Sequence, residues 1–202
     1  MVDYSIENEY REKGFNIICG VDEAGRGPLA GPVYAAAVIL PSDCVIEGLN
    51  DSKKLTEKKR EALFDEIKEK ALAYGIASAD EKEIDEINIL NATFLAMKRA
   101  IASLSVRPDL ALIDGNQKPH TDIEEVTVIK GDAKSMSIAA ASVLAKVSRD
   151  RFMLEMAEKY PQYEFARHKG YGTKLHYEKI AKYGVCDIHR RTFLKKILGE
   201  QK

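Results

Sequence analysis

The chain has 202 residues, of which 45% are hydrophobic and 31% charged, with a formal net charge of -1. This composition supports one large domain with a buried core, and a net charge near zero argues against a protein that coats nucleic acid by bulk attraction. No apolar run is long enough to cross a membrane, and the polar opening Met1-Val2-Asp3 predicts no signal peptide. Three cysteines without metal-binding spacing fit a reducing cytoplasm.

Charge is unevenly distributed along the chain. Residues 146–202 contain 14 Lys or Arg against 7 Asp or Glu, whereas the preceding residues contain 17 against 25. An acidic part could hold metal ions and a basic part could hold phosphates. The alternative, a pair of solvated helical faces, is the commoner origin of such a split.

Hydrophobic periodicity predicts strands that alternate with helices, which indicates an α/β layer structure. Strands are expected over 16–22, 33–40, 73–79, 110–113 and 126–129, and helices over 56–72, 89–104, 134–159, 173–183 and 191–198. We expect residues 1–160 to form the main domain and residues 161–202 a small helical, basic region packed on it.

Carboxylates follow three of the predicted strands. Asp22 and Glu23 lie at the end of the first strand, Asp114 follows the fourth, and Asp132 follows the fifth. Ligands of α/β sheets gather at the carboxyl ends of strands, so we expect the four acids to converge. Oxygen ligands without nearby His or Cys suit Mg²⁺ or Mn²⁺, and two such ions can clamp the attacking and leaving oxygens of a phosphoryl transfer. The alternative for Asp132 is an N-cap of the next helix.

A glycine-rich segment follows the first pair of acids. Gly25-Arg26-Gly27 lets the backbone approach a ligand closely and supplies amide donors and a guanidinium. Carboxylates for metal beside such a segment form a nuclease-like combination. The alternative is an ordinary turn that ends a strand.

The histidines predict structural or surface roles, because they have no spaced partners. His168 lies in a basic stretch, Arg167-His168-Lys169, and is expected to face solvent or phosphate, while His176 and His189 lie further along the same basic region. The absence of a Gly-x-x-x-x-Gly-Lys-Ser/Thr loop disfavours a nucleotide-hydrolysing motor, and the absence of a Gly-x-Ser-x-Gly elbow disfavours a serine hydrolase.

Several blocks of the sequence resemble the signature of the type 2 ribonucleases H, specifically bacterial ribonuclease HII. They occur in the family's order and cover nearly the whole chain. The blocks are Asp22-Glu23-Ala24-Gly25-Arg26-Gly27-Pro28-Leu29-Ala30-Gly31-Pro32-Val33, Asp51-Ser52-Lys53-Lys54-Leu55, Asp114-Gly115, Lys130-Gly131-Asp132-Ala133, Ser137-Ile138-Ala139-Ala140-Ala141-Ser142, His168-Lys169-Gly170-Tyr171-Gly172-Thr173 and Ile188-His189-Arg190-Arg191-Thr192-Phe193. The short segment before the first strand and an aspartate as fourth acid favour type 2 over the related type 3 enzymes.

The resemblance implies a ribonuclease H-like fold with a mixed central sheet flanked by helices. It implies cleavage of RNA in RNA–DNA hybrids and 5′ of a single ribonucleotide embedded in duplex DNA, leaving 3′-hydroxyl and 5′-phosphate ends. Carried over by motif, Asp22, Glu23, Asp114 and Asp132 would be the catalytic and metal-binding residues. They would hold Mg²⁺ or Mn²⁺, with two ions in the reacting complex.

The resemblance also implies a set of substrate-binding residues. Gly25, Arg26 and Gly27 would read the ribose 2′-hydroxyl and the adjacent phosphate, since that hydroxyl marks RNA. Tyr171 would sense the sugar next to the scissile bond, and Lys53 would contact phosphate. The expected setting is a cytoplasmic monomer that acts on hybrids and ribonucleotide-containing DNA in replication and ribonucleotide excision repair. The alternatives are another two-metal nuclease of the same fold, such as a junction resolvase, and a non-catalytic hybrid-binding module.

Overall fold

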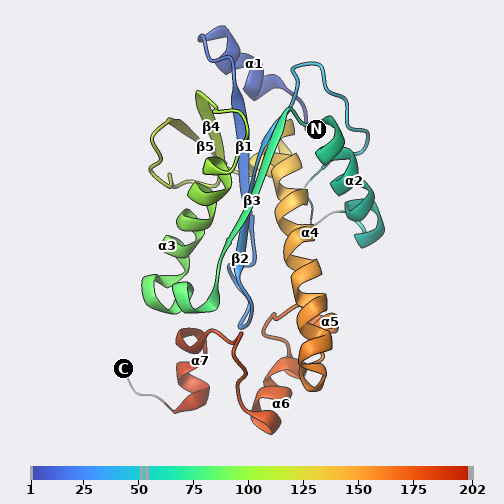
Figure 1. Ribbon diagram of the computed structural model, residues 1–202, viewed down its shortest axis with the longest axis vertical. Coiled ribbons are helices and arrows are strands. Elements are labelled where there is room, and N and C mark those ends of the chain that lie inside the picture. Colours follow the sequence, from blue (N-terminus) through green and yellow to red (C-terminus); the bar gives the residue numbers. More distant parts are fainter. Residues whose placement is uncertain (1, 51, 53–54, 200–202) are drawn as a thin grey trace.

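A five-stranded mixed sheet forms the centre of the molecule (Figure 1). The structure, a computed structural model, describes residues 2–50, 52 and 55–199. The strands are β1 (Ile18–Ala24), β2 (Val33–Ile39), β3 (Ala73–Ala79), β4 (Leu110–Asp114) and β5 (Glu124–Val128), in the spatial order β3-β2-β1-β4-β5. β2 pairs antiparallel with both β1 and β3, whereas β4 runs parallel to β1 and β5 parallel to β4.

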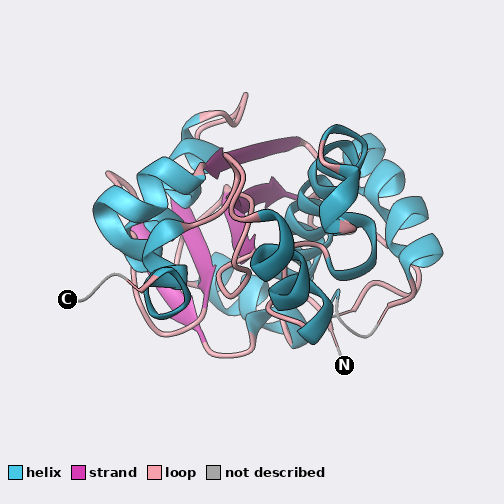
Figure 2. Ribbon diagram, turned by 90° about the horizontal axis from the view of Figure 1, so that it is seen from below, coloured by secondary structure: helices cyan, strands magenta, loops and turns pink. Residues whose placement is uncertain are grey.

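Helices cover both faces of this sheet (Figures 1 and 2). α3 (Glu81–Ala102) packs on one face, and α2 (Glu57–Lys70) and α4 (Met136–Lys159) pack on the other. The chain begins with α1 (Ser5–Glu12). The elements after α4 gather at one end of the molecule: the 3₁₀ turn η3 (Pro161–Tyr163), α5 (Phe165–His168), α6 (Lys174–Tyr183) and α7 (Arg191–Leu198). The expected helical C-terminal region is therefore present, and its separation as a domain at residue 160 stays a prediction.

Alternation along β2 divides its side chains between two cores. Ala35 and Ala37 face the core that contains the buried residues of α3, while Ala36 and Val38 face the core beneath α2 and α4. The α4 residues in that second core include the run of alanines over 139–141. Side chains of this size let the helix lie close to the sheet.

The expected elements are found, but two boundaries shift where the acids lie. β1 extends to Ala24, so Asp22 and Glu23 are among its last three residues. The long helix begins at Met136, and its N-cap is Ser135, whose hydroxyl accepts a hydrogen bond from the Ile138 amide at 3.2 Å. The N-cap interpretation of Asp132 is therefore wrong, because this residue lies in the preceding 3₁₀ turn η2 (Gly131–Ala133).

α3 starts eight residues earlier than its apolar periodicity predicts. Asp80 and Glu83 form a capping box at its N-terminus, and the helix is interrupted at Asn88, where φ is +67°. The Asn88 side chain then accepts hydrogen bonds from the amides of Leu90 and Asn91, which restarts the helix. Within the described part of the chain, no helix is long and apolar enough to cross a membrane.

Candidate active site

Parallel strand pairing brings the acid-bearing strand ends to one edge of the sheet. Val21 of β1 lies opposite Ile113 of β4, so Asp22 and Asp114 follow paired positions on adjacent strands. Asp114 in turn lies opposite Val128 at the end of β5, and the turn that contains Asp132 follows. The strand order thus confirms the expected convergence of these three strand ends.

Asp22 carries the strongest electrostatic signature of the site. Its side chain is buried, with 4% of the residue exposed, and it accepts a hydrogen bond from the Glu23 amide at 2.7 Å. Burial, followed by the negative charges of Glu23 and Asp114, holds the pKa of the Asp22 carboxyl well above its usual value. A cation bound at this edge would remove that penalty.

Asp114 is tied directly to the turn that carries the fourth acid. The Gly131 amide donates a hydrogen bond of 2.6 Å to Asp114 Oδ1. Asp132 is the next residue and is buried, with 7% exposed. Because this hydrogen bond joins the end of β4 to the turn, it fixes the position of Asp114 relative to the backbone beside Asp132.

The carboxylates fit a hard divalent cation by their donor chemistry. All four offer oxygen, and burial together with the negative charges of Glu23 and Asp114 already raises the pKa of Asp22. Across residues 2–50, 52 and 55–199, no three His, Cys, Asp or Glu side chains are grouped so that they could hold a metal ion as they stand. One oxygen of Asp22 and one of Asp114 accept backbone hydrogen bonds, so binding requires rotations that bring the acids' oxygens to a common point.

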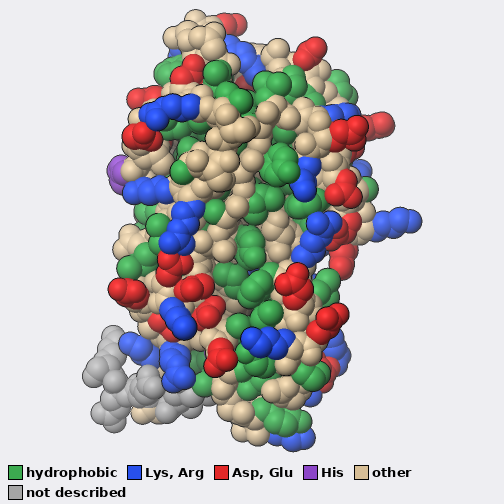
Figure 3. Space-filling model, in the orientation of Figure 1, with side chains coloured by type: hydrophobic (Ala, Val, Ile, Leu, Met, Phe, Trp, Pro, Cys, Tyr) green, Lys and Arg blue, Asp and Glu red, His purple; other side chains and the backbone are tan. Residues whose placement is uncertain are grey.

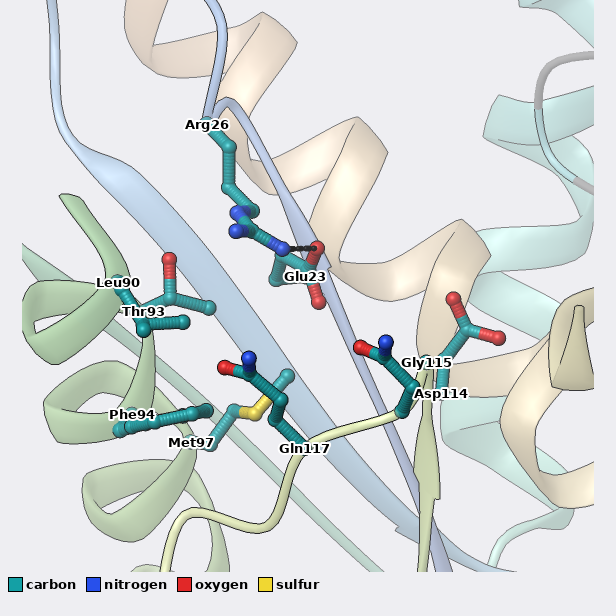
Figure 4. A pocket seen from close by; sticks show the side chains of 10 residues that line it. Glu23, Arg26, Leu90, Thr93, Phe94, Met97, Asp114, Gly115 and Gln117 are labelled. Carbon is teal, nitrogen blue, oxygen red and sulfur yellow. Dashed lines mark ion pairs between the residues drawn. The ribbon is translucent and has the colours of Figure 1, made fainter. Parts of the chain in front are cut away.

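A cavity of about 240 Å³ opens beside the acids (Figure 4). Glu23, Arg26 and Asp114 line it from the sheet edge, and Thr93 and Phe94 line it from α3. Arg26 Nη1 lies 3.6 Å from Glu23 Oε1, the ion pair drawn as a dashed line in Figure 4. The guanidinium therefore reaches from the glycine-rich loop to the acids.

A second cavity, of about 210 Å³, contains the residues expected to read the substrate. Gly25, Arg26, Gly27 and Tyr171 all line it, although Tyr171 is far away in sequence. Tyr171 is 42% exposed, so its ring is accessible. Lys53, the remaining expected substrate contact, lies outside the described residues.

Gly25 occupies a position that only glycine fits. Its φ is +99°, and a Cβ atom there would lie 2.0 Å from Nε of Arg149. A side chain would therefore meet both backbone strain and a steric clash. The glycine of this motif allows the loop to lie directly on a buried arginine.

Two buried arginines hold the glycine-rich loop, and sequence reasoning missed both roles. Arg190 donates to the carbonyls of Gly25 (2.6 Å), Arg26 (2.9 Å) and Gly31 (2.8 Å). Burial, and then the positive charge of Arg149, lowers the pKa of Arg190 to about 9, which leaves it protonated at neutral pH. The only signal was its place in the Ile188–Phe193 block.

The three histidines of the basic region have structural roles, as predicted, but none faces solvent. His168 is buried and its Nε2 hydrogen-bonds to the Tyr163 carbonyl at 2.9 Å, so its expected solvent- or phosphate-facing position is wrong. Nε2 of His176 and Nε2 of His189 lie 3.1 Å apart, and Nδ1 of His176 lies 3.0 Å from the Tyr171 carbonyl. These contacts fix the loop that carries Tyr171.

The positive charge of the C-terminal region is partly internal or neutralised. Lys146 pairs with Asp150 at 2.6 Å, and Glu164 pairs with both Arg167 (2.8 Å) and Lys179 (2.6 Å). On the face shown in Figure 3, basic and acidic side chains are interspersed. The excess of 14 basic over 7 acidic residues therefore overstates the charge available to a nucleic acid.

The strand order and the flanking helices define a protein of the ribonuclease H-like class. The structure is similar to the crystal structure of ribonuclease H2 from Pyrococcus horikoshii OT3, with a TM-score of 0.75 and 28% identity over 92% of this chain and 97% of that one. It also shares its fold with Bst-RNase HIII in complex with Mn²⁺, with a TM-score of 0.65 and 18% identity over 83% of this chain and 63% of that one.

Within this class, the chain belongs to the ribonuclease HII family. The family described as Ribonuclease HII matches residues 19–196. Ribonuclease HII of Caldicellulosiruptor bescii is 58% identical over 196 residues, which are 97% of this chain and 95% of that relative. The chain is thus an endoribonuclease whose substrate is a nucleic acid, and the expected fold, family and activity are confirmed over the two alternatives.

Proposed function

We propose that this ribonuclease cuts RNA in RNA–DNA hybrids and cuts 5′ of a single ribonucleotide embedded in duplex DNA, leaving 3′-hydroxyl and 5′-phosphate ends. One observation carries the proposal: the two cavities share Glu23 and Arg26. A ribose read by the glycine-rich loop in one cavity would place its neighbouring phosphate beside the acids that border the other.

The direction of the loop's amides supports its role as a reader of ribose. Arg190 binds the carbonyls of Gly25 and Arg26 from the protein interior. In a trans peptide the N–H of the next residue points opposite to the carbonyl. The amides of Arg26 and Gly27 therefore point away from Arg190, where they can donate to a 2′-hydroxyl or a phosphate oxygen.

Asp22, Glu23, Asp114 and Asp132 would hold Mg²⁺ or Mn²⁺, with two ions in the reacting complex. Bound in this way, the ions supply an activated water and stabilise charge on the departing oxygen. The protein's part is positional. The Glu23 amide donates to one oxygen of Asp22 and the Gly131 amide to one oxygen of Asp114, which holds both carboxylates at this edge of the sheet.

Tyr171 would test the sugar on the 3′ side of the ribonucleotide. An aromatic ring packs well against a deoxyribose face that lacks a hydroxyl. The Tyr171 ring is exposed and lines the second cavity, beside the glycine-rich loop. We further propose a phosphate contact for Lys53 and a monomeric, cytoplasmic enzyme acting in replication and ribonucleotide excision repair. Three free cysteines suit a reducing compartment.

The test compares three substrates in Mg²⁺: a duplex with one ribonucleotide, its all-DNA counterpart and a continuous RNA–DNA hybrid. We expect cleavage of the first and third only, with the cut of the first directly 5′ of the ribonucleotide. Mapping the product ends should give a 3′-hydroxyl and a 5′-phosphate. Equal cleavage of the all-DNA duplex, or products with 5′-hydroxyl ends, would overturn the proposal.

The role of Tyr171 is tested on the same substrates. Tyr171→Ala should lose far more cleavage rate than binding affinity on the single-ribonucleotide duplex, because the scissile phosphate would be misplaced. Tyr171→Phe keeps the ring and should retain part of the rate. If Tyr171→Ala cuts both ribonucleotide-containing substrates at the parent rate, the sensor lies elsewhere.

A further inference from the structure

We propose that Arg149 is a positioning residue that locks two substrate-reading segments together and thereby sets the preference for a single embedded ribonucleotide. The segments are the reading loop, residues 25–32, and the tyrosine loop, residues 168–171. The inference rests on the proposed function, because it assigns ribose reading to the first segment and sugar sensing to the second.

One buried guanidinium contacts both segments. Arg149 of α4 is fully buried, and it donates to the carbonyls of Pro32 (3.2 Å) and Ala30 (3.1 Å) in the reading loop. Its remaining nitrogen, Nη1, donates to the Lys169 carbonyl (3.1 Å) in the tyrosine loop. The guanidinium carbon also lies 5.6 Å from the centre of the Tyr171 ring. Arg149 therefore contacts the Tyr171 ring as well as the backbone two residues before it.

The backbones of the two segments are also in direct contact, which restricts their relative movement. The Leu29 amide donates to the Gly170 carbonyl at 2.8 Å. A Cβ atom on Gly170 would lie only 2.5 Å from the Ala30 carbonyl oxygen. Because the guanidinium is a planar fork with fixed donor directions, sliding one segment past the other would break a charge-assisted hydrogen bond in a buried site. The two segments therefore move together or not at all.

Arg190 provides a matched comparison within the same chain. It is also fully buried, and its three acceptors are also backbone carbonyls. All three acceptors, Gly25, Arg26 and Gly31, lie in the reading loop. Arg190 thus shapes one segment, whereas Arg149 fixes the spacing between two.

This spacing matters more for one substrate than for the other. At a single ribonucleotide, the 2′-hydroxyl and the neighbouring deoxyribose must be read at once, so a correct distance between the reading loop and Tyr171 is required. In a continuous hybrid every sugar of the RNA strand carries the hydroxyl, so reading-loop contacts can form in any register. Weakening the Arg149 contacts should therefore lower the preference for a single embedded ribonucleotide before it abolishes cleavage.

The experiment measures cleavage rates of Arg149→Lys and Arg190→Lys on the single-ribonucleotide duplex and on the hybrid. Lysine keeps the charge and loses the fork. For Arg149→Lys we expect the rate on the single-ribonucleotide duplex to fall roughly tenfold or more beyond any fall on the hybrid, the scale of one charge-assisted hydrogen bond. Arg190→Lys should lower both rates by similar factors. A parent-like ratio of the two rates in Arg149→Lys would overturn the proposal.

A second pair of variants reaches the lock without altering a buried charge, in case Arg149→Lys does not fold. Gly170→Ala places a methyl group against Ala30, whereas Gly184→Ala has a similar positive φ (+74° against +83°) and nothing within 4 Å of the new methyl group. We expect Gly170→Ala to lower the cleavage rate on the single-ribonucleotide duplex relative to the rate on the hybrid. Gly184→Ala should leave this ratio unchanged. An unchanged ratio in Gly170→Ala would contradict the lock.

Two further readouts separate positioning from general stabilisation. If Arg149 acts through Tyr171, Arg149→Lys should not change the rate ratio further in a Tyr171→Ala background, whereas additive losses would refute the coupling. Hydrogen exchange without substrate should rise in both segments for Arg149→Lys and only in the reading loop for Arg190→Lys. A parent protein that fails to cut the single-ribonucleotide duplex would defeat the proposed function. The hydrogen-exchange result would still show whether Arg149 holds the two segments together.

Discussion

Replacing Asp22 by asparagine should make the metal-free protein more stable while it disables cleavage. The Asp22 carboxylate is buried beside Glu23 and Asp114, and its pKa is raised well above 3.8 for that reason. Asparagine has nearly the same shape, and its amide oxygen can still accept the hydrogen bond from the Glu23 amide. The substitution therefore removes an unfavourable buried charge with little change in packing.

The pH dependence gives this prediction its sign and size. Well below pH 3.8 the carboxyl is protonated in both the folded and the unfolded chain, so its ionisation costs nothing. Above that pH the unfolded chain releases the proton first, and the free energy of unfolding of the parent falls as pH rises toward the folded-state pKa. The advantage of Asp22→Asn should grow over this window at up to about 1.4 kcal/mol per pH unit and then level off.

The assay is urea unfolding of both proteins at a series of pH values in chelator. Asp43→Asn is the control, because it removes the same charge from an exposed loop after β2, at the opposite end of the sheet. Adding Mg²⁺ should stabilise the parent more than Asp22→Asn, since a ligand stabilises the state that binds it. A variant that is less stable than the parent at neutral pH, or an advantage that shrinks as pH rises, would refute the reasoning.

Three further predictions follow from other contacts. Thr56→Ala should cost about 1 kcal/mol of stability, measured by urea unfolding, and leave cleavage unchanged, because it removes only the α2 cap at the Lys59 amide. Burial lowers the pKa of both His176 and His189 to about 4, so the free energy of unfolding should fall as pH drops from 6.5 toward 4. His189→Gln should make this pH dependence shallower, and a steeper dependence in the variant would contradict the prediction. Substrate binding, followed by fluorescence anisotropy, should weaken steeply with salt, and a flat response would remove Lys and Arg contacts from the binding account.

Much of the architecture follows from short-range patterns in the sequence. The apolar runs that become β1 and β4 end in acids, and the alternation of strands with helices predicts that such ends meet at one edge. The pairing of Val21 with Ile113 shows that they do. The helix expected over 56–72 is likewise found as α2, with Thr56 as its N-cap.

What the sequence left open depends on contacts between distant segments. Arg149 looks like one more charged residue on a long helix, and only the fold places it beneath Gly25 and beside Lys169. His168 lies between two basic residues, yet its burial depends on packing against Phe165. Periodicity reports one face of one element, so it cannot reveal a polar side chain that joins three segments.

Catalysis by the acids at the converging strand ends is tested most directly by single-turnover cleavage of the single-ribonucleotide duplex in saturating Mg²⁺ by the parent, Asp114→Asn and Asp43→Asn. Asp114→Asn removes one ligand charge at the converging strand ends, whereas Asp43→Asn removes one at the far end of the sheet. We expect Asp43→Asn to cut at the parent rate and Asp114→Asn to lose several orders of magnitude in cleavage rate while still binding the duplex. Near-parent cleavage by Asp114→Asn would contradict this expectation.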